Sequence, residues 1–306
     1  MIIIKDIVIL LVSIIVIGKG AVWLVDAAAR VAKHFGISEL VIGLTVVAFG
    51  TSAPEFGVTI LAAIRGMGDI SVGNIVGSNI FNLGFILGGT AIIHSLKTSR
   101  TIVFRDGFFL LFGGILLSVF LWDLTLSKIE GIVLFSLLIV YLLYLYVKKE
   151  TIETEEPTHA MYRWDPILLF VGIGLVILGS HFLVESAVSI ARFMGVSDWV
   201  IGATIIAAGT SAPEFATSLT AAMKSRYGMS VGNLIGSDIF NLFGVLGVAG
   251  MMRNLSVGHD AHINLIILSF MIAVVLIFMR TGWVVSRKEG IILVMIGLLR
   301  WIYSFS

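Results

Sequence analysis

Gly50-Thr51-Ser52-Ala53-Pro54-Glu55-Phe56 occurs twice in this chain, because the same residues return as Gly209-Thr210-Ser211-Ala212-Pro213-Glu214-Phe215, 159 positions later. A second block repeats at the same shift, as Val72–Asn82 (VGNIVGSNIFN) and Val231–Asn241 (VGNLIGSDIFN). Both blocks lie inside long apolar stretches, where an acid or amide is costly in a bilayer unless it has a function. A polar element broken by Gly or Pro and repeated in both halves of a membrane chain indicates a binding site at the interface of the two halves.

The composition is that of an integral membrane protein. Hydrophobic residues make up 58% of the chain and charged residues 13%, with a mean hydropathy of +1.07, whereas soluble domains carry about 25% charged residues. A net charge of +1 gives no support for a nucleic-acid partner, and the absence of cysteine excludes disulfides and thiolate metal sites. No nucleophile–base pair or set of metal-binding histidines occurs, so we expect neither an enzyme nor a bound cofactor.

Ten apolar segments predict an all-α protein with ten transmembrane helices. Most of them reach the roughly 20 residues that a helix needs to cross a bilayer, although the fourth is short. The segments cover residues 6–29, 39–64, 70–94, 107–121, 129–147, 166–191, 199–223, 229–252, 263–279 and 289–305.

The distribution of lysine and arginine predicts the orientation. Thirteen of the 20 basic residues lie in the loops that follow odd-numbered spans, and six lie on the opposite side, both termini included. Because basic residues are enriched on the cytoplasmic side, we expect a multi-pass plasma-membrane protein with both termini extracellular and the central loop cytoplasmic.

The 159-residue shift predicts two repeats of opposite orientation. Five spans per half is an odd number, so the second copy must face the other way, as in an inverted repeat. The predicted units are a first five-helix repeat at 1–147, a cytoplasmic linker at 148–165 and a second repeat at 166–306. Further matches at the same shift are Asp26 with Glu185 and Gly36 with Gly195. We expect the two acids near the membrane interface, and the alternative is that they guard an entrance.

The first repeated block predicts a broken helix that binds cations. Pro54 has no N–H and clashes with the carbonyl of Gly50, so the helix should kink there and leave backbone oxygens without helical partners. Glu55 adds a carboxylate, and Thr51 and Ser52 lie three or four positions before it, on the same face of a regular helix. The block around Glu214 builds the same arrangement in the second half.

The second block adds hydroxyls and amides to the same centre. Ser78 and Asn82 lie four residues apart, as do Ser237 and Asn241. Without imidazole or thiol, two carboxylates with hydroxyl and carbonyl oxygens suit a hard cation such as Ca²⁺ or Na⁺. The alternative for the two serines is that they only hydrogen-bond one helix to another.

The paired motifs G-T-S-A-P-E and G-N-x-x-G-S-x-x-x-N resemble the repeats of the cation/calcium antiporter superfamily, and most closely its prokaryotic sodium/calcium exchangers. Proton/calcium exchangers of that superfamily carry G-N-x-x-E where this chain has G-T-S-A-P-E. The resemblance covers the whole chain. It implies an antiporter that exchanges Na⁺ for Ca²⁺ by alternating access at four central sites, with the first and sixth spans sliding against the rest.

The resemblance also implies which residues bind each ion. It assigns calcium to Glu55 and Glu214 with the backbone oxygens of Thr51 and Thr210. It assigns sodium to the residues Ser78, Ser237, Ser52 and Ser211 and to the carbonyls of Ala48 and Ala207, and it places Asn82 and Asn241 in the middle of the site.

One position departs from the resemblance. Many relatives have an aspartate where this chain has Asn241, and potassium-dependent members use an acid there, so we do not expect potassium dependence. The second half instead has Asp238 where the first has Asn79. Asp238 either lines the central site or hydrogen-bonds a neighbouring helix.

Three other interpretations of the function stay open from the sequence. A calcium/proton or other cation antiporter would use the same fold with a different coupling ion. An ion channel usually builds its pore by symmetry between subunits, whereas the symmetry here is internal and inverted, so we expect function as a monomer in the lipid bilayer with Na⁺ and Ca²⁺ as substrates. An intramembrane enzyme would need catalytic groups that these motifs lack.

Overall fold

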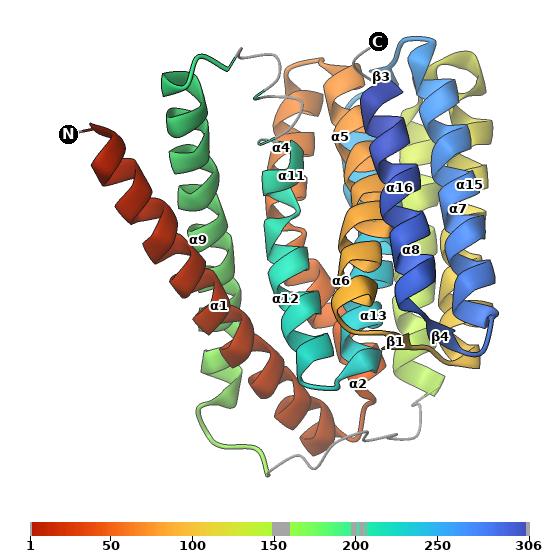
Figure 1. Ribbon diagram of the computed structural model, residues 1–306. Helices are drawn as coiled ribbons and strands as arrows, with labels where there is room; N and C mark the ends of the chain where they lie inside the picture. The colour runs from red at the N-terminus through yellow and green to blue at the C-terminus, as the bar shows by residue number, and fades with distance from the viewer. Residues whose placement is uncertain (1, 149–159, 197–200, 202–204, 206, 304–306) are drawn as a thin grey trace.

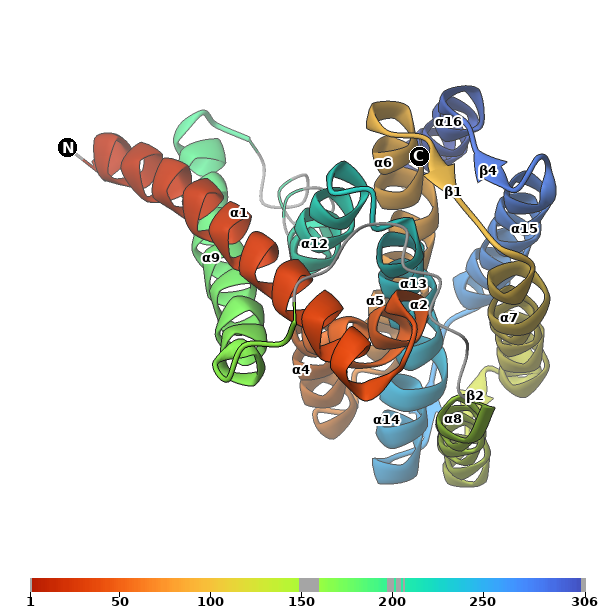
Figure 2. The same cartoon turned by 90° about the horizontal axis from the view of Figure 1, so that it is seen from below.

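The computed structural model describes residues 2–148, 160–196, 201, 205 and 207–303, which form a helical bundle with two short strand pairs. Figure 1 shows α1 and α9 together on one side, beside a main bundle made of the other helices. The view from below in Figure 2 shows α1 and α9 crossing each other at the edge of that bundle. Most of the predicted linker 148–165 and the start of the predicted span 199–223 lie outside the described residues.

The elements of the first half are helical apart from two short strands. Three of the helical segments are π-helical, at η1, η2 and η3, and η4 is a 3₁₀ turn. In chain order they are α1 (Ile2–Phe35), α2 (Glu39–Ile42), η1 (Gly43–Val47), α3 (Ala48–Thr51), α4 (Ala53–Ile64), α5 (Gly68–Phe81), η2 (Asn82–Ile86), α6 (Leu87–Ile93), β1 (Leu96–Lys97), η3 (Ile102–Gly107), α7 (Phe108–Phe120), η4 (Leu121–Asp123), β2 (Thr125–Leu126) and α8 (Lys128–Lys148).

Within the described residues, the second half repeats the order of the long helices and of the two strands, without counterparts of η3 and η4. Its π-helical segment η6 stands 159 residues after the region of η2. In chain order the elements are α9 (Asp165–Phe193), α11 (Ala207–Thr210), α12 (Ala212–Met223), α13 (Tyr227–Ile239), η6 (Phe240–Val245), α14 (Leu246–Met252), β3 (Leu255–Ser256), α15 (Asp260–Arg280), β4 (Val284–Val285) and α16 (Arg287–Tyr303).

The chain is an all-α multi-pass membrane protein. Within the described ranges, 7 helices are long and apolar enough to cross a bilayer, and the bent pair Glu39–Thr51 and Ala53–Ile64 makes 8 if it is one span. These coincide with eight of the predicted spans. The 17-residue α16 occupies the span predicted at 289–305, and α11 and α12 occupy the described part of 199–223.

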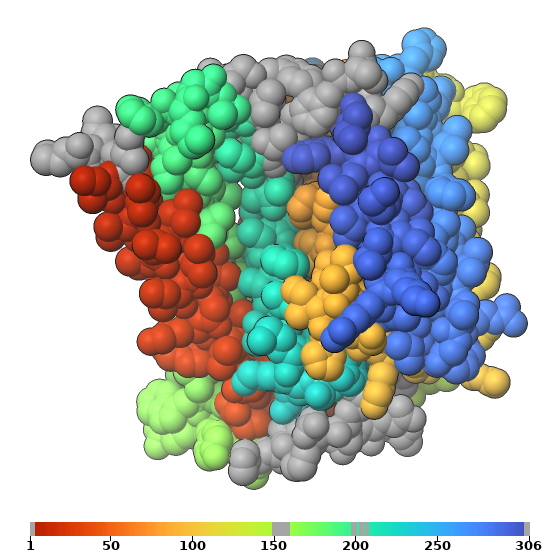
Figure 3. Space-filling model, in the orientation of Figure 1, coloured from red at the N-terminus to blue at the C-terminus, as the bar shows by residue number. Residues whose placement is uncertain are grey.

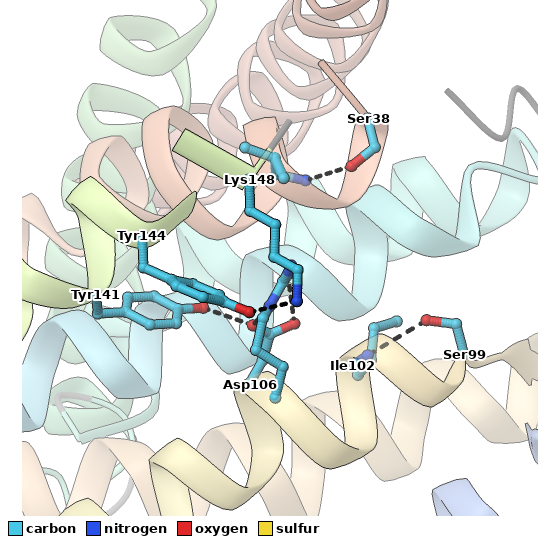
Figure 4. Close-up of polar contacts among 9 residues, drawn as sticks. Ser38, Ser99, Ile102, Asp106, Tyr141, Tyr144 and Lys148 are labelled. Atoms are coloured by element: carbon cyan, nitrogen blue, oxygen red, sulfur yellow. Dashed lines mark hydrogen bonds and ion pairs between the residues drawn. The ribbon is translucent and has the colours of Figure 1, made fainter. Parts of the chain in front are cut away.

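The fourth span is longer than the sequence indicated. It covers Ile102–Asp123, 22 residues, because the π-helical η3 extends it towards the chain start through Arg105 and Asp106. The guanidinium of Arg105 pairs with the buried Asp106 carboxylate at 2.6 Å, and the Tyr141 hydroxyl donates to the same oxygen over 2.8 Å. Figure 4 shows Asp106 facing Tyr141 of α8, with Tyr144 and Lys148 farther along that helix. Because these two charges neutralise each other, the helix can begin at Ile102, before the apolar stretch from which the span was predicted.

Glycines let α1 and α9 cross closely. A Cβ on Gly20 would lie 2.8 Å from Leu175 Cβ, and one on Gly172 would lie 2.8 Å from the backbone nitrogen of Leu24. Small residues at such crossings permit the close backbone approach by which membrane helices associate. Both helices are followed by a glycine with positive φ, Gly36 at 65° and Gly195 at 81°, a conformation that favours glycine.

The core lies around α5–α6 and α13–α14. Almost every residue of α13 is buried, and the aromatic rings of Phe109 and Phe243 stack with centroids 4.4 Å apart where α7 meets η6. The largest cluster of buried side chains joins these helices to α7, α8 and α15. The repeated G-N-x-x-G-S blocks of α5 and α13 therefore stand inside the largest buried cluster of the molecule.

Two strand pairs connect the halves at opposite ends. β1 pairs antiparallel with β4, with Leu96 opposite Val285, and β2 pairs antiparallel with β3, with Leu126 opposite Leu255. Figure 1 shows β1 and β4 at the lower end of the view and β3 at the upper end. Each pair joins one strand from either half, so the two halves are linked at both ends of the bundle.

Candidate ion-binding centre

Each repeated heptapeptide breaks a helix at its serine. Ser52 has φ −78° and ψ 9° between α3 and α4, and the helices on either side of it are bent by 52°. Ser211 has φ −91° and ψ 9° between α11 and α12. Pro54 and Pro213 stand in the first turn of the following helix, where a missing N–H is tolerated. The predicted kink is therefore present in both halves.

The two glutamates meet serines of the opposite half. Ser52 Oγ donates to Glu214 Oε1 over 3.0 Å, and Ser211 Oγ donates to Glu55 Oε1 over 3.0 Å. Both carboxylates are fully buried, and within the described residues neither Glu55 Oε2 nor Glu214 Oε2 has a hydrogen-bond partner. Two buried carboxylates, each with one oxygen left over, make a centre that attracts cations.

Two asparagines hold the broken helices in place, and the sequence analysis did not assign them a role. Asn74 Nδ2 donates to Thr59 Oγ1 over 2.9 Å and to the Glu55 carbonyl over 3.4 Å. Asn233 makes the equivalent bonds to Ser218 Oγ and the Glu214 carbonyl, at the same two distances. The sequence did contain a signal for this role, because both residues are the Asn of the repeated G-N-x-x-G-S block.

The hydroxyl of Ser237 is enclosed by residues of the first half. It lies 3.4 Å from Thr51 Oγ1 and 3.5 Å from the Ala48 carbonyl oxygen. Thr51 Oγ1 also contacts Asn233 Oδ1 at 3.2 Å. The structure therefore brings together the predicted residues Ala48, Thr51 and Ser237, with every one of them buried.

The equivalent serine of the first half borders a cavity. Ser78 is 5% exposed and lines a cavity of about 270 Å³ together with Asn74, Phe81, Arg300 and Trp301. Ala207 begins α11, and Thr210 ends that helix with a part-buried side chain. The two serines thus share a sequence context but differ in their surroundings.

Four polar side chains form a layer across the middle of the bundle. Asn82 Nδ2 donates to Asp238 Oδ1 over 2.9 Å, and Asn241 Nδ2 donates to Asn79 Oδ1 over 3.1 Å. Asn79 Nδ2 in turn donates to the Asp238 carbonyl over 3.1 Å. All four residues are fully buried. Asp238 therefore hydrogen-bonds residues of the opposite half.

Several oxygens of this centre are left for a ligand. In the polar layer, the buried oxygens without a hydrogen-bond partner among the described residues are Asp238 Oδ2, Asn82 Oδ1 and Asn241 Oδ1. Oxygen donors with negative charge are the ligands that Ca²⁺ and other hard cations take. Asn82 begins η2 and Asn241 lies in η6, and such π-helical segments often mark functional sites.

Comparison with known proteins identifies the family. Residues 5–147 and 164–301 match the family described as sodium/calcium exchanger protein. This chain belongs to the sodium/calcium exchanger family. Among its relatives in that family, Sodium/calcium exchanger MaX1 of Methanosarcina acetivorans is 33% identical, over 94% of this chain and 95% of the relative. Inner membrane protein YrbG of Escherichia coli is 32% identical, over 92% and 90%.

Solved structures of the family share the fold. The sodium-calcium exchanger NCX_Mj soaked with 10 mM Na⁺ and 10 mM Sr²⁺ superposes with a TM-score of 0.86 at 32% identity, over 97% of each chain. The same exchanger soaked with zero Na⁺ and Ca²⁺ gives a TM-score of 0.86 at 31% identity, over 99% of this chain and 100% of that one. The match to this exchanger therefore covers almost the whole of this chain.

Proposed function

We propose that this protein is a secondary active antiporter that exchanges Na⁺ for Ca²⁺ across a prokaryotic plasma membrane. The observation that carries the proposal is the pair of buried glutamates, Glu55 and Glu214, each held by a serine of the opposite half and each with a free oxygen. The family and the names of its relatives support Na⁺ and Ca²⁺ as the substrates. A calcium/proton antiporter on the same fold is less favoured, because the matched family is the sodium/calcium one.

The proposed topology is ten transmembrane helices in two inverted five-helix repeats, at 1–147 and 166–306. The linker 148–165 would be cytoplasmic and both termini extracellular, as the lysine and arginine distribution favours. Contacts that recur at the 159-residue shift, such as the two strand pairs, support an internal symmetry. Because this symmetry is contained in one chain, we propose that the monomer transports.

The proposed ligands follow the oxygens of the centre. Calcium would bind the free oxygens of Glu55 and Glu214 with the backbone oxygens of Thr51 and Thr210. Sodium would bind at two flanking positions, one built from Ser237, Ser52 and the Ala48 carbonyl, the other from Ser78, Ser211 and the Ala207 carbonyl. The remaining central oxygens come from Asn82, Asn241 and Asp238.

Competition for shared oxygens would produce the exchange. Two ionised glutamates balance one Ca²⁺ but not Ca²⁺ together with several Na⁺, so each ion displaces the other without direct contact between them. An exchange of about three Na⁺ for one Ca²⁺ moves one net charge, worth about 2.3 kcal/mol per 100 mV of membrane potential. Transport should then respond to voltage.

The test is calcium uptake into proteoliposomes loaded with Na⁺, K⁺ or choline, with the pH clamped equal on both sides. We expect uptake only with internal Na⁺, and loss of uptake in Glu55→Gln and Glu214→Gln. Glu130→Gln is the matched control, because Glu130 caps α8 at 2.7 Å from the Ser127 nitrogen, outside the centre. Uptake that ignores Na⁺ and follows an imposed pH gradient would contradict the sodium coupling.

A lower pH should inhibit uptake. Protons compete with Ca²⁺ for the carboxylates of Glu55 and Glu214, and a protonated carboxyl no longer supplies a negative ligand. The measurement is initial uptake at several pH values, equal on both sides, in vesicles loaded with Na⁺. Uptake that does not fall when the pH is lowered from about 8 to about 5 would contradict this mechanism.

A further inference from the structure

One ion pair joins α1 to the end of α12. Lys224 Nζ lies 2.6 Å from Asp26 Oδ1, and the two side chains are 33% and 31% exposed. Lys224 directly follows α12 as its C-cap residue, and α1 packs along that helix. The pair therefore holds α1 against the main bundle at the lower end of the view in Figure 1, where α12 ends.

The positions that correspond to this ion pair in the other repeat, 159 residues away, also carry two opposite charges. Asp26 corresponds to Glu185 of α9, and Lys224 corresponds to Arg65, the residue that ends α4. These two side chains are exposed. Glu185 is 68% exposed and lies 3.9 Å from His181 of its own helix, and Arg65 has no ion pair within the described part of the chain. The same charges thus pair in one copy and stand apart in the other.

The contact between α1 and α9 does not show this difference. Arg30 pairs with Asp165 at 2.7 Å near one end of the two helices. The positions that correspond to them, Ser189 and Asp6, are joined by a hydrogen bond of 2.5 Å near the other end. Because both equivalent contacts are formed, α1 and α9 form one unit. The difference between the copies lies in how this unit meets the main bundle.

Burial shows the same asymmetry. Leu24 and Val25 of α1 are fully buried, whereas the corresponding Leu183 and Val184 of α9 are only part-buried. On the facing helices, Thr217 of α12 is 0% exposed and the corresponding Val58 of α4 is 39% exposed. Figure 3 shows the lower part of α1 lying directly against α12. The unit is therefore closed onto the bundle at its lower end and looser at its upper end.

We propose that Asp26–Lys224 and Glu185–Arg65 are alternative ion pairs that close the two ends of the ion passage in turn. When the α1–α9 unit moves so that the upper end closes, Glu185 meets Arg65 and Asp26 leaves Lys224. This inference rests on the proposed inverted repeat and on exchange by alternating access. The neighbouring Glu39–Arg226 pair is different, because the position that corresponds to Arg226 is Met67.

Cysteine cross-linking tests the alternation directly, because the natural chain contains no cysteine. One protein carries Asp26→Cys with Lys224→Cys, and another carries Glu185→Cys with Arg65→Cys. A control protein carries Asp6→Cys with Ser189→Cys, inside the α1–α9 unit. Each is reconstituted in lipid, exposed to Na⁺, Ca²⁺ or neither, and treated with a short, reducible thiol cross-linker. Uptake before treatment shows that each protein is folded.

We expect both test pairs to cross-link and their yields to change in opposite directions between ion conditions, while the control yield stays constant. Either test cross-link should stop calcium uptake, and reduction should restore it. Glu185→Gln removes the competing Glu185–Arg65 ion pair. Added to the protein with cysteines at positions 26 and 224, it should raise the ratio of cross-linked to uncross-linked protein about two- to fivefold, the range for partly exposed ion pairs.

Two results would overturn the alternation. One is a Glu185–Arg65 cysteine pair that never cross-links in a protein that still takes up calcium. The other is a pair of yields that rise and fall together. Both are distinct from failure of the proposed function, which would appear as absence of sodium-driven uptake in the unmodified protein, whatever the cross-linking shows.

Discussion

Ser78 and Ser237 occupy equivalent positions in the two repeats, yet they have different surroundings. Ser237 is enclosed by Thr51 and the Ala48 carbonyl, whereas Ser78 borders a cavity of about 270 Å³. The sequences around the two serines are nearly identical, but the helices that surround them differ, because the cavity at Ser78 is also lined by Arg300 and Trp301 of α16. A repeated sequence can therefore adopt an asymmetric structure.

The largest effect is expected from substitutions that remove one negative charge from either half of the centre. Glu55→Gln and Glu214→Gln should each weaken Ca²⁺ binding by at least about a hundredfold, or about 2.8 kcal/mol, because each deletes a charged ligand from a buried site. Isothermal titration calorimetry of the detergent-solubilised protein measures this, with Glu130→Gln as control. A large loss in one variant and normal binding in the other would show that calcium is bound by one half only.

The second prediction concerns the layer where the copies differ in sequence. Asp238→Asn should lower Ca²⁺ affinity about tenfold, or about 1.4 kcal/mol, because a buried negative charge attracts a divalent ion across several ångströms. Adding Asn79→Asp moves the acid to the first half and should restore part of the affinity. If Asp238→Asn leaves calcium titrations unchanged, the carboxyl serves only the hydrogen bond from Asn82.

The third prediction compares the two bracing asparagines. Asn233→Ala should reduce calcium uptake about fivefold and Asn74→Ala about twofold, within the range for loss of one or two buried hydrogen bonds. The larger effect is expected for Asn233 because it is fully buried and also contacts Thr51. Initial uptake rates at matched protein levels decide the order. Equal losses would mean that the extra Thr51 contact is unimportant.

The smallest effect should be equal in both halves. Ser127 with Glu130 and Ser286 with Glu289 form matching capping boxes, in which each glutamate accepts a backbone N–H over 2.7 Å. Glu130→Ala and Glu289→Ala should each lower the free energy of unfolding by about 0.5–1 kcal/mol and leave transport intact. Thermal unfolding in detergent gives the comparison, and a strong transport defect in either variant would contradict a purely structural role.

Much of the centre could be predicted from the sequence, because polar and charged side chains are rare inside membrane spans unless they have a function. The two glutamates, the broken helices and the buried serines and amides lie where the repeat predicts. The bracing role of Asn74 and Asn233 was missed, since an amide that binds the backbone of another helix has no signature apart from its recurrence. The start predicted for the fourth span at residue 107 was too late, because Arg105 and Asp106 neutralise each other and only the packing reveals this.

The asymmetry between the copies could not be predicted. Asp26 and Glu185 were both expected near the interface, and nothing local tells which of them finds a basic partner. A protein that alternates between two conformations uses the same residues in both. A sequence repeat therefore predicts that a contact can form in either copy, but it does not predict which copy forms it in a given conformation.

The strand pairs constrain how the chain is made. Leu96 pairs with Val285, which is 189 residues farther along the chain. At roughly 5–20 residues per second, about 10–40 s pass between the synthesis of the two strands. During that interval the first half lies in the membrane with β1 lacking β4 and, until Ser211 is synthesised, with Glu55 lacking its serine partner. The nascent first half must therefore wait in a partly assembled state, so the membrane insertion machinery or early lipid contacts have to shelter its polar centre until the second half arrives.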